Sequence, residues 1–232
     1  MYEKYSEYDN TLEAIKSIKK KIESLKNKLQ KLSCFLGFDG YIDYLYSLCQ
    51  SRESATEWTK MKNMKTFGAL ITNVAGSSAN IERILKRKIS GGFAPNSCKA
   101  INGIGVKVYL IAALGYPNIN EAFTPLINKD SIDAISFSKP GKTLALEFDD
   151  GKIMLTDFEN ILKINWDLLI KQVKLKTIIE KIETSDIMGF GYWSLIPEIE
   201  EMWAHFLYDV FPNVNNFSDI TEFIVYLRFL LT

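Results

Sequence analysis

The chain has 232 residues, which is enough for one large α/β domain or two small ones. Hydrophobic residues make up 47% of it, the share of an ordinary globular protein. Lysine and arginine number 28, and aspartate and glutamate also number 28, so the net charge is zero. This balance argues against a nucleic-acid-binding protein, because such proteins normally carry a basic excess or a basic stripe.

The three cysteines, Cys34, Cys49 and Cys98, are far apart and show no CxxC spacing. This pattern favours a reduced, cytoplasmic compartment over a disulfide framework. With His205 as the only histidine, we expect no zinc site. The sequence has no run of about 18 apolar residues that would predict a membrane span, and its polar N-terminus does not resemble a signal peptide.

Residues 1–32 form an N-terminal extension in which an amphipathic helix is predicted. Seven apolar residues follow at spacings of three or four: Leu12, Ile15, Ile18, Ile22, Leu25, Leu29 and Leu32. Such a stripe predicts one apolar face, with lysines on the others. The favoured interpretation is a helix that lies on the protein's own sheet. A coiled-coil or dimer contact is one alternative, and a membrane-surface helix, weakened by the lack of aromatic anchors, is the other.

From residue 33 to about residue 212, strand and helix patterns alternate. Apolar runs predict core strands at residues 33–38, 106–114 and 187–193. Further strands are expected at residues 41–49, 132–137, 144–148 and 152–156, the last two joined by the hairpin turn Asp149-Asp150-Gly151. Helical patterns cover residues 51–87, 95–103, 157–183 and 197–210. Strands separated by helices predict a parallel α/β core, and the segments near 41–49 and 132–156 predict a small antiparallel appendage.

Two carboxylates follow the first predicted strand, in the loop Gly37-Phe38-Asp39-Gly40-Tyr41-Ile42-Asp43. Ligands of open α/β sheets bind beyond the carboxyl ends of the strands, so Asp39 and Asp43 are candidates for ligand contact. Carboxylates suit a sugar or polyol, since they accept paired hydrogen bonds from neighbouring hydroxyls. The alternative is that both are turn and cap residues, a common role of aspartate.

The second candidate segment is Gly91-Gly92-Phe93-Ala94-Pro95-Asn96. A glycine pair lets backbone amides approach a ligand closely, and Pro95 suits the first turn of a helix. Asn96 would then lie on that first turn. The alternative is a left-handed turn with an ordinary helix cap.

The order and spacing of these motifs resemble the ribokinase-like (PfkB) carbohydrate kinases over roughly residues 33–210. That family opens with a strand and a Gly-x-(Asn/Asp)-x-x-x-Asp loop, continues with a Gly-Gly-x-x-x-Asn helix start, and then has a strand ending in Leu-Gly, here Leu114-Gly115. The resemblance implies a three-layer ribokinase-like α/β core with a small antiparallel β lid. It also implies a substrate-binding set, here Asp39, Asp43, Gly91, Gly92 and Asn96.

The family's second signature, Gly-Ala-Gly-Asp, is missing, because no Gly-x-Gly-Asp occurs in this sequence. In relatives, its glycines open a helix N-terminus that holds the phosphate charge, and its aspartate deprotonates the sugar hydroxyl. We therefore expect a C-terminally truncated fold and name no catalytic residue and no metal ligand. ATP and Mg²⁺ are implied only for intact relatives.

The resemblance implies ATP-dependent phosphoryl transfer to a sugar hydroxyl in intact relatives, and it makes this chain the substrate-binding part of a sugar kinase-like protein. The alternatives are a non-catalytic sugar-binding or dimerising protein, and a fragment of a split gene. The apolar segment 213–232 carries a helical stripe from Phe217 to Leu231. It predicts self-association, with a homodimer through the lid or through this segment.

Overall fold

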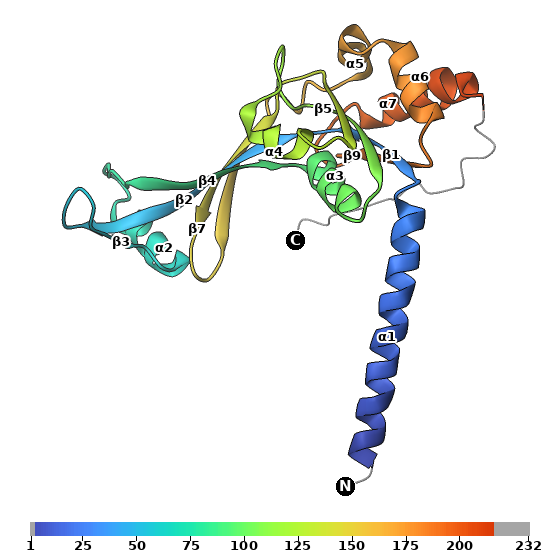
Figure 1. Cartoon of the computed structure of the whole chain (residues 1–232). Coiled ribbons are helices and arrows are strands. Elements are labelled where there is room, and N and C mark those ends of the chain that lie inside the picture. Colours follow the sequence, from blue (N-terminus) through green and yellow to red (C-terminus); the bar gives the residue numbers. More distant parts are fainter. Residues whose placement is uncertain (1–2, 216–232) are drawn as a thin grey trace.

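The structure is a computed structural model that describes residues 3–215, with the side chains of residues 11–19, 21, 22 and 24–215. Figure 1 shows three parts: a body in which helices cover a sheet, a second sheet that extends from one end of the body, and a long N-terminal helix that projects away from it.

The body contains a four-stranded parallel sheet with the strand order β6-β5-β1-β9. Its strands are β1 (Ser33–Phe38), β5 (Lys107–Ala112), β6 (Ile132–Ser136) and β9 (Ile187–Gly191). β1 lies inside the sheet and all six of its residues are buried, which is why this strand is apolar on both faces. β9 is an outer strand of this sheet.

Helices cover both faces of the body sheet. Successive residues of a strand point to opposite faces, so Cys34 and Leu36 of β1 pack with Cys98 of α3 (Phe93–Gly103) on one side. On the other side, Phe35 belongs to a cluster with residues of α5 (Trp166–Gln172), α6 (Leu175–Glu183) and α7 (Ile199–His205). The predicted α/β class, with three layers, is confirmed.

The second sheet, called the lid sheet below, consists of β2 (Tyr41–Arg52), β3 (Trp58–Lys60), β4 (Arg83–Gly91), β7 (Gly141–Glu147) and β8 (Lys152–Asp157). β2 pairs antiparallel with β3 and β4, and β7 pairs antiparallel with β8. β2 and β7, however, are parallel, so the expectation of a purely antiparallel lid is wrong at this pairing. Both strands leave the body at the same place, where the Gly141 N–H donates to the Gly40 carbonyl at 2.9 Å.

Two predictions for this region are wrong. Residues 132–136, expected in the lid, form the outer strand β6 of the body sheet. Residues 83–87, expected as helix, belong to strand β4. The Arg83 guanidinium lies 4.6 Å from the centre of the Tyr46 ring on β2, one of several cation–aromatic contacts in the lid. Such cross-strand contacts favour a strand, and the spacing of residues along the sequence does not reveal them.

The remaining helices complete the two sheets. α2 (Met64–Asn73) packs Phe67 and Leu70 against the lid residues Leu48 and Phe148. The shorter helical segments are η1 (Glu121–Phe123), α4 (Thr124–Ile127), η2 (Phe206–Val210) and η3 (Phe211–Asn213).

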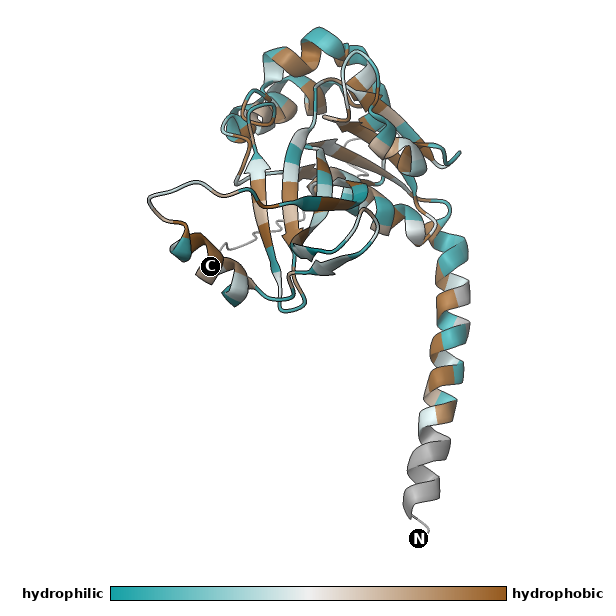
Figure 2. Ribbon diagram, turned by 90° about the vertical axis from the view of Figure 1, so that its left-hand side faces the viewer, coloured by the Kyte–Doolittle hydropathy of each residue, from teal (hydrophilic) through white to brown (hydrophobic). Residues whose placement is uncertain are grey.

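α1 (Glu3–Leu29) does not lie on the body's sheet, so the favoured prediction for this helix is wrong. Leu29 and Leu32 reach the body's apolar cluster on the α3 side. Ile15, Ile18 and Ile22 remain 54%, 55% and 57% exposed, and Figure 2 shows hydrophobic residues recurring along the projecting helix. The physical reason is that α3 and α5 to α7 already cover both faces of the body sheet.

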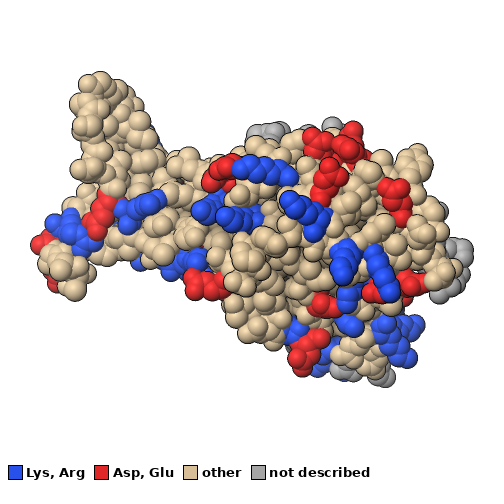
Figure 3. Space-filling model, turned by 90° about the horizontal axis from the view of Figure 1, so that it is seen from above, with Lys and Arg blue, Asp and Glu red and all other residues tan. Residues whose placement is uncertain are grey.

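Charged side chains of both signs are interspersed on the face seen in Figure 3. The ion pairs of the structure include Lys88 with Glu121 at 2.7 Å and Arg52 with Glu82 at 2.6 Å. Among the described residues, no helix is long and apolar enough to cross a membrane. The predicted stripe from Phe217 to Leu231 falls outside the described residues.

Candidate functional site

Asp39 lies at the carboxyl end of β1, in the two-residue link to β2. It is fully buried, and its two carboxylate oxygens accept hydrogen bonds from the backbone N–H groups of Phe93 and Ala94, at 2.7 Å and 2.8 Å. These N–H groups belong to the first turn of α3, where no helical carbonyl is available to them. In the structure Asp39 therefore caps α3, which is the alternative interpretation that the sequence analysis left open. Its buried carboxylate is not exposed to a sugar.

Burial raises the pKa of the Asp39 carboxyl to about 6, although the hydrogen bonds from Ala94 and Phe93 act in the opposite direction. Gly92 makes room for this carboxylate: its φ is +99°, and a Cβ atom there would lie 2.7 Å from Asp39 Oδ2. The glycine thus serves the cap, and any L side chain at this position would be strained.

Asp43 has a different environment. It lies on β2 in register with Thr143 of the neighbouring parallel strand β7, and it is half-buried. Partial burial raises the pKa of the Asp43 carboxyl, while a hydrogen bond with Thr143 and the charge of Lys99 act to lower it. A Cβ atom on Gly91 would lie 2.2 Å from Asp43 Oδ2, so the glycine leaves the space that the carboxylate occupies.

The first two turns of α3 bring a cation and an amide to the same place. Asn96 is exposed, and its backbone N–H donates to the Gly92 carbonyl at 3.1 Å. The Lys99 ammonium donates to the Ser90 carbonyl at 2.8 Å and to Asn96 Oδ1 at 3.4 Å. Desolvation lowers the pKa of Lys99, and the Asp43 charge counteracts this.

The structure therefore divides the predicted site residues into two groups. Asp39 and Gly92 form a buried cap of α3, whereas Asp43, Gly91 and Asn96 belong to a polar surface next to it. That surface holds an anionic acceptor, a cationic donor and an amide beyond the carboxyl ends of the body's strands. This combination offers both hydrogen-bond donors and hydrogen-bond acceptors to hydroxyl groups.

Sequence reasoning missed two members of this polar surface. Lys99 follows Asn96 by three residues, and residues three apart lie on the same side of a helix, so helical spacing was a usable signal. Thr143 had no such signal, because only the pairing of β2 with β7 brings it next to Asp43.

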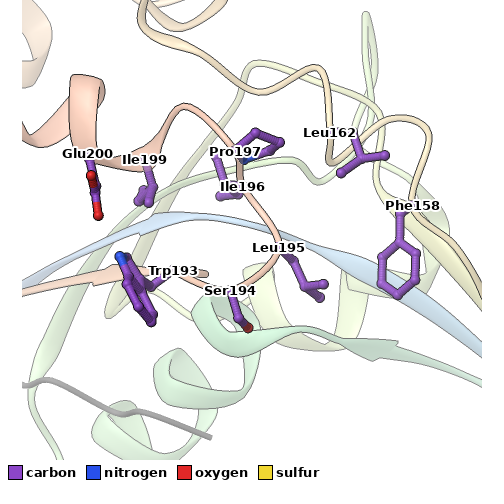
Figure 4. A pocket seen from close by; sticks show the side chains of 9 residues that line it. All are labelled: Phe158, Leu162, Trp193, Ser194, Leu195, Ile196, Pro197, Ile199 and Glu200. Carbon is purple, nitrogen blue, oxygen red and sulfur yellow. The ribbon is translucent and has the colours of Figure 1, made fainter. Parts of the chain in front are cut away.

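A hollow of about 370 Å³ lies beyond the end of β9. Figure 4 shows Phe158 and Leu162 on one side of it and Trp193 and Glu200 on the other. Trp193, two residues after β9, thus forms part of the wall of this hollow. The Phe158 ring also contacts the Tyr41 ring, with 6.4 Å between ring centres, so the hollow adjoins the start of β2.

The model of the prokaryotic ketohexokinase family matches residues 8–224, which is most of the chain. The chain belongs to the prokaryotic ketohexokinase family. This result confirms the resemblance to carbohydrate kinases that the loop and glycine motifs indicated, and it extends the match into the N-terminal helix.

One curated ketohexokinase relative, from Haloferax volcanii, is 27% identical to the chain over 182 residues. The alignment covers 78% of this chain and 48% of that protein, so the chain spans about half the length of its ketohexokinase relative.

Two of the solved structures that are similar to the chain carry the names of sugar kinases. A carbohydrate kinase from Agrobacterium tumefaciens is 16% identical, with 68% of this chain and 45% of that chain covered at a TM-score of 0.45. Ribokinase from Cryptococcus neoformans var. grubii serotype A, solved in complex with ADP, is 13% identical, with coverages of 76% and 44% and a TM-score of 0.39.

Proposed function

We propose that this chain is the substrate-binding part of a sugar kinase and that its substrate is a ketohexose such as D-fructose. The supporting observation is the position of Asp43, which is half-buried at the carboxyl edge of the body next to Lys99 and Asn96. The substrate class comes from the name of the relative from Haloferax volcanii.

The chemistry of the polar surface suits neighbouring hydroxyls. An ionised Asp43 carboxylate accepts hydrogen bonds from two hydroxyl groups, and Lys99 and the Asn96 amide donate to the oxygens of the same sugar. Gly91 has no side chain, so a ring can approach the strand end closely. A site of this kind rejects analogues that lack a hydroxyl, because its partly buried polar groups are then left unpaired.

ATP and Mg²⁺ are the co-substrates that the resemblance implies for intact relatives. Among the described residues, no three histidine, cysteine, aspartate or glutamate side chains are placed to hold a metal ion. The sequence also has no Gly-x-Gly-Asp. The proposal assigns hydroxyl recognition to this chain and no step of phosphoryl transfer.

We place the protein in the cytoplasm. Cys34, Cys49 and Cys98 are all free thiols in the structure, and burial raises the pKa of Cys34 and of Cys98 to about 12. Unpaired thiols of this kind persist most readily in a reducing compartment.

Isothermal titration calorimetry of the full chain with D-fructose tests the proposed function. We expect saturable binding in the millimolar range or tighter, and weaker binding of 1,5-anhydro-D-mannitol, which lacks the hydroxyl on the anomeric carbon of the ring. Equal affinity for the two compounds would contradict recognition by paired hydrogen bonds, and no binding of either would contradict the proposal itself.

A further inference from the structure

α1 is a 27-residue helix whose apolar face projects from the body between Leu12 and Leu25, whereas Leu29 at its end packs against the body. The five apolar residues from Leu12 to Leu25 are between 38% and 57% exposed. Helices in water owe most of their stability to packing of such a face. This exposed apolar face therefore indicates a binding partner, and the sequence of the helix indicates which kind of partner fits it.

The spacing along the helix is that of a coiled coil. From Ile15 to Leu32 the apolar residues follow at intervals of three, four, three, four and three, a period of 3.5. Ile15, Ile22 and Leu29 then occupy heptad position a, and Ile18, Leu25 and Leu32 occupy position d. Leu29 and Leu32 pack against the body, so the exposed part of the seam runs from Ile15 to Leu25. The resulting seam is narrow and has no aromatic residue, which favours a second helix over a lipid surface.

Charge is distributed unequally along the same helix. Residues 3–13 contain four acidic residues and one lysine, whereas residues 14–32 contain seven lysines and one glutamate. A helix that is acidic in its first half and basic in its second is complementary to a copy of itself that runs in the opposite direction.

The positions that flank the seam distinguish the two orientations of such a pair. In a parallel pair, position g faces position e of the next heptad, so Lys21 would face Lys26 of the partner subunit and repel it. In an antiparallel pair, position g faces position g. With Ile15 opposite Ile18 of the partner subunit, position 7 of the helix falls opposite position 28 of the partner, and the sequence has glutamate at the first position and lysine at the second.

We propose that α1 is a dimerisation helix, through which two copies of this chain associate as an antiparallel coiled coil. The proposal goes beyond sugar recognition and does not depend on it. The helix projects from the body, so the seam between Ile15 and Leu25 is accessible to a second copy (Figures 1 and 2).

The first test measures the dissociation constant of the full chain by sedimentation velocity over a range of concentrations. We expect a monomer–dimer equilibrium that the double substitution Ile18→Asp/Leu25→Asp weakens by at least about 100-fold, because burying one such side chain is worth roughly a tenfold change in affinity or more. The matched control is Ser17→Asp/Ser24→Asp, which adds the same charges one position away, at heptad position c. It should leave the dimer unchanged, and urea unfolding should show the same body stability in both variants.

The second test is a charge exchange that reports orientation. Glu7→Lys and Lys28→Glu should each weaken the dimer about threefold to tenfold, and the double exchange should restore it, because the two positions face each other only in the antiparallel pair. Failure of the double exchange to restore the dimer would overturn the antiparallel arrangement.

Three other results would overturn the proposal. They are a monomer at all concentrations, a dimer that is insensitive to Ile18→Asp/Leu25→Asp, and a monomer that binds vesicles of anionic phospholipid through the same face. The last result would assign the seam to a membrane surface.

Discussion

The titration of Asp39 gives the sharpest prediction about the fold. Its carboxyl is fully buried, and its pKa is raised from 3.8 to about 6. Between these two pH values, the folded protein keeps a proton that the unfolded chain has released. The contribution of Asp39 to stability is therefore fully present below pH 4 and is lost as the pH rises through 6. The difference is about two pH units, and at 1.36 kcal/mol for each unit this amounts to about 3 kcal/mol.

The comparison with Asp39→Asn isolates this effect. The amide keeps the shape of the side chain and does not titrate, and the loss of one acceptor oxygen towards Phe93 or Ala94 adds a constant difference at every pH. Urea unfolding of both proteins between about pH 4 and pH 7 should show the wild type losing about 3 kcal/mol relative to the variant. Parallel curves would refute the reasoning. A wild type that gains stability with pH would show that the two N–H donors outweigh burial.

Three further substitutions probe the surroundings of the site. Tyr41→Phe should stabilise the protein by about 1 kcal/mol in urea unfolding, since the buried Tyr41 hydroxyl has no hydrogen-bond partner among the described residues. Gly91→Ala should weaken D-fructose binding about tenfold in calorimetry, because the Cβ atom of the new alanine would displace the Asp43 carboxylate. Gly103→Ala is the control, since no atom lies within 4 Å of the Cβ atom that it adds. Lys99→Met should raise the pKa of Asp43 further. As the pH is lowered, D-fructose binding should therefore be lost at a higher pH in the variant than in the wild type. An unchanged pH profile would show that Lys99 does not act on Asp43.

The sequence predicted the α/β body well, because β1 and β5 are buried on both faces and therefore read as continuous apolar runs. It failed for β4, whose lysines and arginines are typical of a solvated helix. In the structure Arg83 and Lys86 lie over aromatic rings of the lid, and these contacts depend on strand pairing that no local pattern encodes.

The two carboxylates show the same limit at the candidate site. Asp39 and Asp43 have equivalent signals in the sequence, since both follow a strand in a glycine-containing loop. Their environments separate them: the first turn of α3 takes both oxygens of Asp39, while Asp43 is displaced along β2 to a position beside Thr143 and Lys99. The motif marks both carboxylates alike, and only the three-dimensional arrangement separates the buried cap residue Asp39 from Asp43, which lies at a polar surface.

The affinity of the full chain for D-fructose, measured by calorimetry in the wild type and in Asp43→Asn, tests the central claim most directly. We expect the substitution to weaken binding by about 1–3 kcal/mol, or roughly fivefold to 150-fold, because it removes a charged acceptor. Asp130→Asn removes an equally charged but exposed carboxylate before β6 and should leave the affinity unchanged. Equal affinities in all three proteins would contradict the assignment of Asp43 to substrate binding.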